Sequence, residues 1–450
     1  MMNFLSTLCT IAVPIILQNF LSSFVNMLDT IMVGQLGSVD IAAVGLGNQI
    51  FFIMNITMFG IVSGGSIFMT QFWGKKDLNG VHRTMGITIT ASAVISVLFF
   101  CAATFAPEFC LRIYSKDNVV IEHGAAYLRA VAPSYIFTGL GFAISHALRS
   151  TERVKLPMVS TAISVIVNGI FNYILIFGIR TGSVELIPAM GVIGAALATT
   201  IARIVEFAIL LIVPYKKGYE IAVPPRRYFS KHEVGFIPRY IKICVPVLLS
   251  EAMWAIGISL QSSIYAHAGT KIIAAFNITS TISNLVWTFF IGCGNAAAII
   301  LGKKIGEEKI DEARHLSKRL TGFMAGAAAV LGLLLIPLAF MLKYFFKVEP
   351  EVIRMAQVFL FITVILYPIY ATNMNIIVGV CRSGGDTMYG LFLDNGFMWL
   401  LALPLGFCAI NFWHLPFWGI FLCIHTEDIC KCVMGLLRLH SGKWLHDLTS

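Results

Sequence analysis

The run PIILQNFLSSFVNMLDTIMVGQLG (Pro14–Gly37) indicates the fold class of this chain. Asp29 is the only charged side chain between Met1 and Val39, so this run is apolar enough to cross about 30 Å of hydrocarbon as a helix. Similar runs recur along the 450 residues, of which 58% are hydrophobic and 12% are charged. About a quarter of the residues in a soluble domain are charged. The composition therefore indicates a polytopic membrane protein.

Twelve membrane helices are expected, because long continuous apolar runs are typical of helices and not of the alternating strands of a membrane barrel. The first two runs exceed one span, so we expect them to tilt or bend. No basic segment followed by a cleavage site opens the chain, so we expect no signal peptide. The expected helices are 5–33, 41–72, 86–108, 124–147, 157–178, 190–213, 240–266, 272–301, 320–342, 352–376, 388–411 and 416–437.

The distribution of Lys and Arg predicts the orientation. Of the 32 basic residues, 23 lie on one side of the expected membrane, mainly in residues 75–83, 149–155, 216–242 and 303–319 and in the C-terminal tail. Cytoplasmic loops carry such an excess. We therefore expect both termini in the cytoplasm and the chain in the plasma (inner) membrane. The net charge of +9 reflects this topology, and we expect no nucleic-acid partner.

The ten cysteines are scattered singly through apolar segments, where free cysteine behaves as a small hydrophobic residue. Cys430 and Cys432 lack a second ligand pair at zinc spacing, so we expect no structural metal.

An internal repeat indicates two related halves. When the sequence is shifted by 232 residues against itself, one register holds without a gap over some sixty positions, and identical residues coincide at several of them. A shift of 233 places LRSTER (148–153) over CRSGGD (381–386). We expect an N-lobe (1–213), a cytoplasmic linker (214–239), a C-lobe (240–437) and a tail (438–450). The coinciding pairs include Pro14 and Pro246, Gly37 and Gly269, Gly60 and Gly292, and Gly74 and Gly306.

Duplicated halves of six helices are common in secondary transporters, where the halves move against each other around a central binding site. A channel or a structural membrane protein is the alternative, but no selectivity-filter motif is visible. No GxxxxGK[ST] motif is present, so an ABC-type pump is excluded within this chain. We expect no enzyme.

Asp29 ends a polar stripe on the first helix. Gln18, Ser22, Asn26 and Asp29 are spaced by four, four and three residues, so they share one helix face. Lipid does not satisfy such groups, so the stripe should face the bundle interior or a wet cavity. Alternatively, the carboxylate caps the chain locally near Gly34.

The fifth and sixth helices offer partners for Asp29. Asn168 and Asn172 are one turn apart on one face, and Thr199 follows GVIGAALA in the next helix. Buried asparagine often joins membrane helices by hydrogen bonds. Alternatively, these groups and Asp29 form one proton or cation site.

The seventh helix carries Glu251 and Gln261, which we expect to take part in ion coupling or substrate binding. In the repeat register Gln261 coincides with Asp29, so the two acids are not symmetry mates. We expect Glu251 nearer the cytoplasm, either as a second ion site or as a structural partner of Lys242 or another basic loop residue.

Further polar and aromatic groups in the C-lobe could line a cavity. Aromatic faces together with an acid suit organic cations, although for any single Trp or Tyr aromatic packing or a place in the membrane interface is the favoured interpretation. Asp394 is a third internal acid, with no role assigned, and we interpret Arg203 and Glu206 as a structural ion pair. The cavity-lining candidates are Trp254, Asn277, Asn284, Tyr367, Tyr370 and Asn373.

These segments together resemble the MATE (multidrug and toxic compound extrusion) family over nearly the whole chain. The resemblance implies a twelve-helix, two-lobed antiporter that expels organic cations and amphipathic drugs by means of proton or sodium gradients. The similar segments include PIILQNFLSSFVNMLDTIMVGQLG, TQFWGKKD, NGIFNYILIFG, GVIGAALATTIAR, PVLLSEAMW and CRSGGDT.

The same resemblance implies that Asp29 is the coupling acid of the N-lobe, with Asn168, Asn172 and Thr199 beside it. Glu251 matches the helix-seven acid of the sodium-coupled branch. Asn172 stands where some members have a second Asp, and no acid occurs between Arg354 and Asp386, where the sodium-coupled branch has one. The coupling ion therefore stays open between H⁺ and Na⁺, with a possible sodium position at Asp29 or Glu251.

We therefore expect a monomeric antiporter that exports cationic or amphipathic small molecules across the lipid bilayer by alternating access, without a cofactor. A flippase for lipid-linked precursors is the runner-up, because it shares the broad fold. A flippase should line its cavity with several cationic residues that bind a phosphate.

Overall fold

The computed structural model describes residues 2–181, 184–228 and 235–449. Residues 229–234, in the middle of the expected linker 214–239, lie outside the described residues, as do Met1, residues 182–183 and Ser450.

Most of the described chain consists of long helices, and eleven of them are apolar and long enough to cross a membrane. Ten are mostly regular helices, and the eleventh is assembled from short α and π segments. The ten are α1 (Met2–Val33), α2 (Ser38–Gly74), α3 (Leu78–Phe105), α5 (Asn118–Ser150), α6 (Lys155–Phe177), α7 (Gly191–Lys217), α9 (Phe236–Ala268), α10 (Thr270–Gly306), α11 (Ile310–Phe345) and α12 (Pro350–Met374), which continues into the π-helical η1 (Asn375–Cys381). The eleventh comprises α13 (Thr387–Leu391), η2 (Phe392–Gly396), η3 (Met398–Ala402) and α14 (Leu403–Asn411).

A twelfth long helix, α15 (Phe417–Ser441), has 25 residues and also carries buried charges. Glu427, Asp428 and Lys431 lie in its middle, which makes it less apolar than the others. The predicted all-α architecture of twelve helices is confirmed. Polar and charged groups inside a membrane helix lower its mean hydropathy, and such groups are normally directed toward the interior of the helix bundle.

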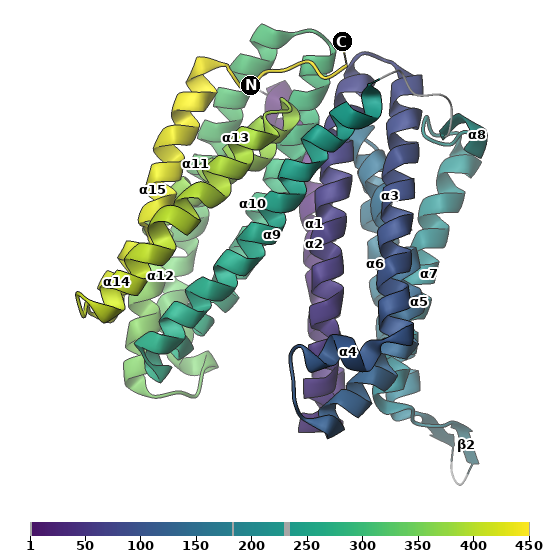
Figure 1. Cartoon of the computed structure of the whole chain (residues 1–450), viewed down its shortest axis with the longest axis vertical. Coiled ribbons are helices and arrows are strands. Elements are labelled where there is room, and N and C mark those ends of the chain that lie inside the picture. Colours follow the sequence, from purple (N-terminus) through teal and green to yellow (C-terminus); the bar gives the residue numbers. More distant parts are fainter. Residues whose placement is uncertain (1, 182–183, 229–234, 450) are drawn as a thin grey trace. The chain divides into compact units, whose positions relative to one another are not determined.

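Short elements at the helix ends were not predicted. They are α4 (Pro107–Arg112), α8 (Pro225–Tyr228) and an antiparallel hairpin of β1 (Ile179–Thr181) and β2 (Val184–Ile187). In Figure 1, α4 and the hairpin lie at one end of the neighbouring helices, and α8 lies at the other end. These elements therefore belong to the loops and leave the helical layout unchanged.

The described chain divides into two compact units. The N-terminal unit comprises Leu17–Met69 and Lys76–Pro238, and the C-terminal unit comprises Met1–Ile16, Thr70–Lys75 and Arg239–Ser450. Both α1 and α2 contribute to both units, because each is divided within its length.

The N-terminal unit is built around a core between α2, α3, α5 and α7. Met54, Met58, Leu128 and Ala196 are wholly buried in it, together with Tyr135. The Tyr135 ring stacks on Phe51 with centroids 5.8 Å apart. Small residues at α7 allow close packing on its neighbour, since a Cβ on Gly194 would lie 2.3 Å from the Leu175 carbonyl oxygen.

Stacked aromatic rings form the core of the C-terminal unit. Tyr265 of α9 stacks on Phe276 of α10 at 4.2 Å, and Phe359 of α12 stacks on Phe421 of α15 at 4.6 Å between centroids. Offset contacts of this kind add to the burial of the rings. Tyr265 also lies 6.2 Å from Phe421 between ring centroids, so these rings hold α15 against both α9 and α12.

Two glycines related by the repeat explain why the end of α2 belongs to the C-terminal unit. A Cβ on Gly74 would lie 2.1 Å from the Lys303 carbonyl oxygen, and one on Gly306 would lie 1.9 Å from the Gln71 carbonyl oxygen. The ends of α2 and α10 thus approach each other through their backbones, as small residues permit in membrane helices. The coincidence of Gly74 and Gly306 in the sequence repeat therefore has a packing reason.

The residues after α15 fold back onto the C-terminal unit. Trp444 is wholly buried, and a Cβ on Gly384 would lie 1.9 Å from its carbonyl oxygen. Gln71 donates to the His446 carbonyl oxygen at 3.1 Å and accepts from the Leu448 amide at 2.8 Å. The described part of the tail is therefore an ordered part of this unit.

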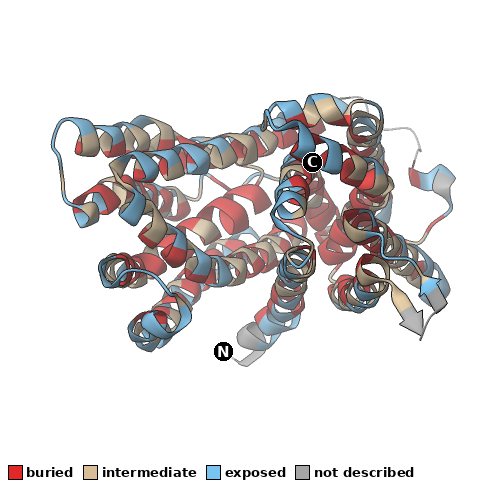
Figure 2. Cartoon of the chain, turned by 90° about the horizontal axis from the view of Figure 1, so that it is seen from below, coloured by how far each residue is buried: buried red, intermediate tan, exposed pale blue. Residues whose placement is uncertain are grey.

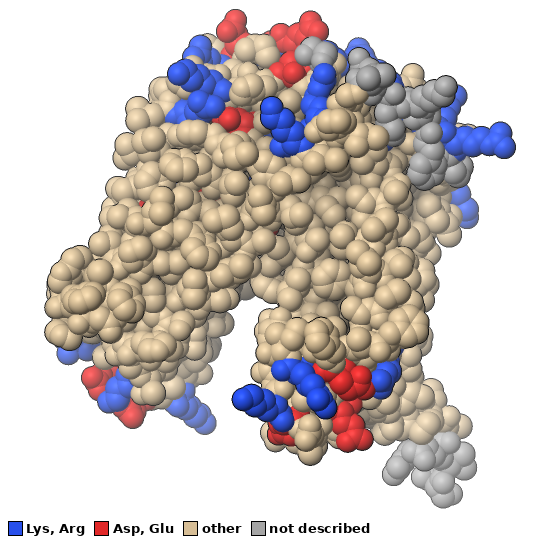
Figure 3. Space-filling view, in the orientation of Figure 1, with Lys and Arg blue, Asp and Glu red and all other residues tan. Residues whose placement is uncertain are grey.

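The charge distribution fits a membrane-embedded chain. On the face shown in Figure 3, charged side chains gather near the helix ends and the surface between them is nearly free of charge. Figure 2 shows that most helices carry buried residues on one side and exposed residues on another. Many of the exposed residues are large and apolar, as a lipid-facing surface requires.

Candidate ion-coupling site

Side chains from α1, α6 and α7 meet at Asp29. The Asn172 side-chain amide donates a hydrogen bond to the Asp29 carboxylate and another to the Asn168 amide oxygen at 3.0 Å. Asn168 in turn donates to the Thr199 hydroxyl oxygen at 3.4 Å. The structure therefore brings together all four residues that the sequence grouped, and it does not show Asp29 as a local cap near Gly34.

The exposure of these groups differs in a way that matters for binding. Asn168 and Asn172 are buried, whereas Asp29 is only half-buried. The Asn172 amide oxygen is buried and has no hydrogen-bond donor within the described chain. The Asp29 carboxylate is thus held by the neutral Asn172 amide group. The oxygen of the same amide group has no donor among the described residues and could contact a bound proton or cation.

The rest of the stripe on α1 changes character along the helix. Asn26 is exposed, and a polar side chain exposed on a membrane helix must meet water because lipid offers it no partner. Ser22 donates to the Gln18 carbonyl oxygen at 3.0 Å. Gln18 itself is buried, so it does not line an open surface in this structure.

Gln18 belongs to a buried chain of hydrogen bonds that the sequence did not reveal. Arg149 donates to the Gln18 amide oxygen at 2.6 Å, and Gln18 donates to the Thr161 hydroxyl at 3.0 Å. Thr161 donates to Glu206 at 2.6 Å, and Arg203 lies 2.8 Å from the other Glu206 oxygen. The predicted Arg203–Glu206 pair is therefore confirmed, and it ends a longer network.

Glu251 forms an ion pair with Arg382. The Arg382 guanidinium lies 2.5 Å from the Glu251 carboxylate, and 8% and 18% of the two side chains are exposed, respectively. The structural alternative for Glu251 was Lys242 or another basic loop residue, and the partner is Arg382, which the sequence assigned to a loop, and not Lys242. Arg149 and Arg382 occupy matching repeat positions, and each donates to a polar side chain in the first helix of its own half.

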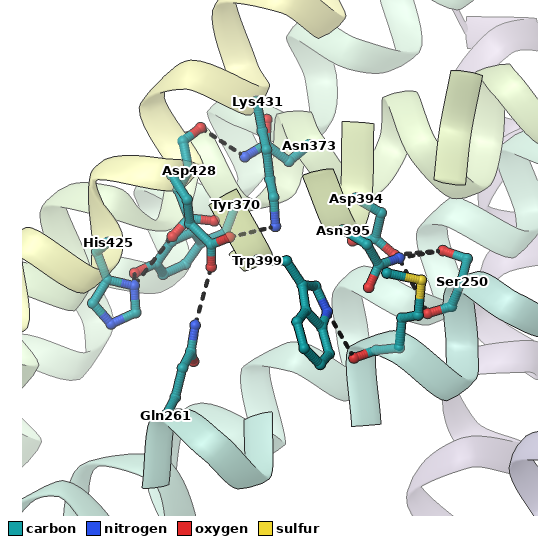
Figure 4. A network of polar contacts seen from close by, with 12 residues as sticks. Ser250, Gln261, Tyr370, Asn373, Asp394, Asn395, Trp399, His425, Asp428 and Lys431 are labelled. Atoms are coloured by element: carbon teal, nitrogen blue, oxygen red, sulfur yellow. Dashed lines mark hydrogen bonds and ion pairs between the residues drawn. The ribbon is translucent and has the colours of Figure 1, made fainter. Parts of the chain in front are cut away.

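Gln261 of α9 and Tyr370 of α12 are directed toward α15, whereas Tyr367 of α12 is directed toward α10. Gln261 donates to Glu427 at 3.2 Å, and Tyr370 contacts His425 at 3.0 Å. The group that they form with Lys431 and Asp428 is drawn in Figure 4. Tyr367 donates to Ser283 at 3.3 Å and is buried. Since Tyr367 and Tyr370 are both buried, they pack inside the unit in this structure and do not line an open cavity.

Asn373 is also buried, and it donates to the Asp428 carbonyl oxygen at 2.9 Å. Trp254 is half-buried on α9. Asn277 and Asn284 are exposed on α10, where Thr281 and Thr288 lie on the same face. An exposed polar face on a membrane helix requires water, so α10 is the part of the C-terminal unit that best fits the expected cavity lining.

Asp394 lies where the eleventh membrane helix departs from α geometry. It accepts from the Ser250 hydroxyl at 3.0 Å, and Asn395 donates to the same hydroxyl at 2.9 Å. Trp399, from the next π segment, donates to the Met253 carbonyl oxygen at 3.3 Å. Figure 4 shows these groups together. Inserted π turns are frequent at functional sites.

Sequence reasoning missed the charged groups of α15, although the letters HTEDICK (425–431) within the expected last helix were the available signal. It also placed Arg149 and Arg382 in cytoplasmic loops and counted Lys431 with the cytoplasmic tail, whereas all three are buried and Lys431 lies within α15. In the described residues, no three His, Cys, Asp or Glu side chains are grouped as ligands for one metal ion.

Comparison with known proteins gives a consistent result. The model of the MatE family matches residues 14–174 and 246–408, once in each half. The chain is 24% identical over 434 residues to "Uncharacterized transporter YisQ" of Bacillus subtilis, covering 96% of this chain and 93% of that protein. It is 22% identical over 443 residues to "Probable multidrug resistance protein NorM" of Thermotoga maritima, with coverage of 97% and 92%.

Solved structures show the same fold. A crystal structure of MATE in complex with MaD3S superimposes with a TM-score of 0.85 at 18% identity, covering 97% of this chain and 96% of that one. A transporter of the MOP superfamily from Pyrococcus furiosus, described as having a binding pocket of reverse polarity, superimposes with a TM-score of 0.82 at 17% identity over the same shares.

Proposed function

Because the chain belongs to the MatE family, we propose that it is an antiporter that exports cationic or amphipathic small molecules in exchange for H⁺ or Na⁺. It is a multi-pass membrane transporter and not an enzyme. The curated relatives include proteins named as multidrug resistance proteins, which supports a small-molecule substrate.

The observation that carries the proposal is the environment of Asp29. Its carboxylate accepts from the neutral amide of Asn172, and the cation that acts on it, Arg203, is ion-paired with Glu206. A carboxylate inside a membrane is costly without a compensating charge. Asp29 is therefore suited to bind a proton, a sodium ion or a cationic substrate in turn.

Competition for one carboxylate provides a simple coupling mechanism. Each bound species stabilises the access state in which it makes better contacts, and the two states exchange as the ligand changes. The Asn168–Asn172 pair holds the carboxylate in a fixed place. The Asn172 amide oxygen, which has no donor among the described residues, can accept a hydrogen bond from protonated Asp29 or contact a bound cation. We propose that Asn168, Asn172 and Thr199 position Asp29 for this exchange.

Glu251 has a different role in this proposal. Arg382 already neutralises its carboxylate, so a second cation would have to displace a buried guanidinium. We therefore assign the exchange to Asp29 and a structural role to Glu251 in the conformation described here. Exposed polar groups on α10, including Asn277 and Asn284, support a wet path for substrate in the C-terminal unit.

No observation favours the flippase. Its phosphate group would need available cations, but the buried cations of the helices have partners. Arg382 pairs with Glu251 and Lys431 with Glu427, while Arg149 donates to Gln18.

We further propose that the protein works as a monomer in the plasma (inner) membrane with both termini in the cytoplasm. The excess of basic residues in one set of loops supports this orientation. The beginning of α1 and the end of the described chain lie at one end of the C-terminal unit in Figure 1, as an even number of spans requires.

The proposal is tested by efflux of a fluorescent organic cation from cells that express the protein. We expect Asp29→Asn to abolish efflux while membrane abundance stays unchanged. Asp40→Asn is the matched control, because Asp40 pairs with His123 at 2.8 Å near the start of α2. Wild-type efflux by the Asp29→Asn variant would disprove the assignment, and loss of efflux in the Asp40→Asn control would show that the effect is not specific.

A further inference from the structure

A buried ion pair in α15 has no role in the function proposed above. Lys431 and Glu427 are one helical turn apart, and the ammonium nitrogen lies 3.0 Å from one carboxylate oxygen. Only 6% and 5% of the two side chains are exposed, respectively. Gln261 of α9 donates to the other carboxylate oxygen at 3.2 Å, so the carboxylate is held from two helices.

The surroundings of the pair are polar and partly unsatisfied. Next to Glu427, Asp428 lies 3.1 Å from His425, and its backbone carbonyl accepts from Asn373. The Asn373 amide oxygen is buried and has no donor within the described ranges of the chain. Figure 4 shows the side chains of Gln261 and Lys431 directed into this cluster.

The helices packed on α15 bring further ionisable side chains to this cluster. From α9, Tyr265 interacts electrostatically with Glu427 and Asp428, and from α12 Tyr370 does the same. From η2, Asp394 interacts with Lys431. The sequences of η1, η3 and α14 contain no Asp, Glu, Lys, Arg or His. The cluster thus has three carboxylates and one fixed cation, with His425 beside Asp428.

A lysine ammonium at this place supplies what a free monovalent cation would supply. It brings one positive charge to a carboxylate that has lost its water, next to an amide and further oxygen atoms. A buried carboxylate requires such a charge, and removal of the partner leaves it uncompensated. The carboxylate would then gain from binding any small cation that reached it.

We propose that Glu427, Gln261 and their neighbours form a monovalent-cation site that Lys431 occupies as a tethered cation. The C-terminal unit consequently offers no sodium site at α15 while the lysine is charged and in place. This inference goes beyond the proposed function, because it concerns a second site, and it does not depend on transport by Asp29.

The test measures the unfolding temperature of the purified full-length protein in detergent, with NaCl exchanged for choline chloride at constant ionic strength. All variants carry Asp29→Asn, so that the N-terminal carboxylate does not contribute. With Lys431→Met added, we expect Na⁺ to raise the unfolding temperature by about 3 °C at a concentration about 100-fold above its Kd. Without that change, we expect no rise.

Two controls identify the site. Lys431→Arg keeps a tethered cation, so we expect no response to Na⁺. Glu427→Gln combined with Lys431→Met removes the carboxylate, so the response should disappear. An absent response in Lys431→Met, an equal response in Lys431→Arg, or a response that persists without Glu427 would each overturn the proposal.

Lys431→His covers the case in which the methionine variant does not fold. Its imidazole is charged near pH 5.5 and neutral near pH 8, since histidine titrates between about pH 5 and 8. We expect stabilisation by Na⁺ at pH 8 and none at pH 5.5, and an absent response at pH 8 would contradict the proposal. Because the readout is binding, its failure is distinct from a failure of the efflux experiment.

Discussion

Replacement of Arg382 by methionine should destabilise the protein by removing the partner of Glu251. The two side chains are 8% and 18% exposed, and the charged atoms are 2.5 Å apart. Methionine keeps much of the length of the side chain but provides neither charge nor donor. Glu251 would then remain as an uncompensated carboxylate in a mostly buried position.

Loss of one partner of a buried ion pair costs about 3–5 kcal/mol. Because Glu251 retains some exposure, we expect the lower end of that range, about 3 kcal/mol. For a chain of 450 residues this corresponds to a fall of roughly 3 °C in Tm, by the usual entropy of unfolding per residue. Simultaneous replacement of both charges should recover most of the loss, because neither charge is then left unpaired.

Thermal unfolding in detergent, followed by size-exclusion chromatography, measures this effect. The variants are Arg382→Met and the pair Glu251→Gln with Arg382→Gln. Arg153→Met is the matched control, since Arg153 pairs with Glu220 where 44% and 30% of the side chains are exposed, and such a pair contributes about 0–1 kcal/mol. If Arg382→Met unfolds at the wild-type temperature, or if the double variant is no more stable than Arg382→Met, the buried-pair reasoning is refuted.

Three further outcomes follow from the contacts. Asn172→Ala should lower efflux strongly at unchanged abundance, since Asp29 loses its donor; efflux at the wild-type rate would contradict this. Gly306→Val should destabilise by about 1–3 kcal/mol, because its Cβ would meet backbone at 1.9 Å, whereas Gly322→Ala has open space and should not destabilise; thermal unfolding of the pair checks the difference. Trp444→Ala should cost about 3–5 kcal/mol, since this side chain is wholly buried, and an unchanged Tm would show that the tail does not stabilise the unit.

The sequence was sufficient to predict the elements that depend on hydrophobicity and spacing. The twelve-helix layout follows from continuous apolar runs. The grouping of Asp29 with Asn168, Asn172 and Thr199 followed from polar positions that recur on helix faces and from the family resemblance. Only a few acids stand within the apolar runs, so each is conspicuous by its cost in lipid.

The other buried polar networks and the ion pairs between helices could not be predicted, because they depend on contacts between segments far apart in the sequence, which the periodicity of one segment does not encode. Arg149 and Arg382 stand near the ends of apolar runs, where a basic residue is normally assigned to a loop. Their burial arises from partners 131 residues away in each case, Gln18 and Glu251. The sequence of α15 contains charged residues, but it does not show that Gln261 of α9 donates a hydrogen bond to Glu427.

The central claim is that binding at Asp29 couples the efflux of an organic cation to an ion gradient. The most direct measurement is transport of a fluorescent organic cation by the purified protein in proteoliposomes, under an imposed pH gradient and, separately, an imposed sodium gradient. We predict that at least one gradient drives transport by the wild-type protein and neither drives it in Asp29→Asn. Gradient-driven transport at equal rates in both proteins, or none in the wild type under either gradient, would contradict the claim.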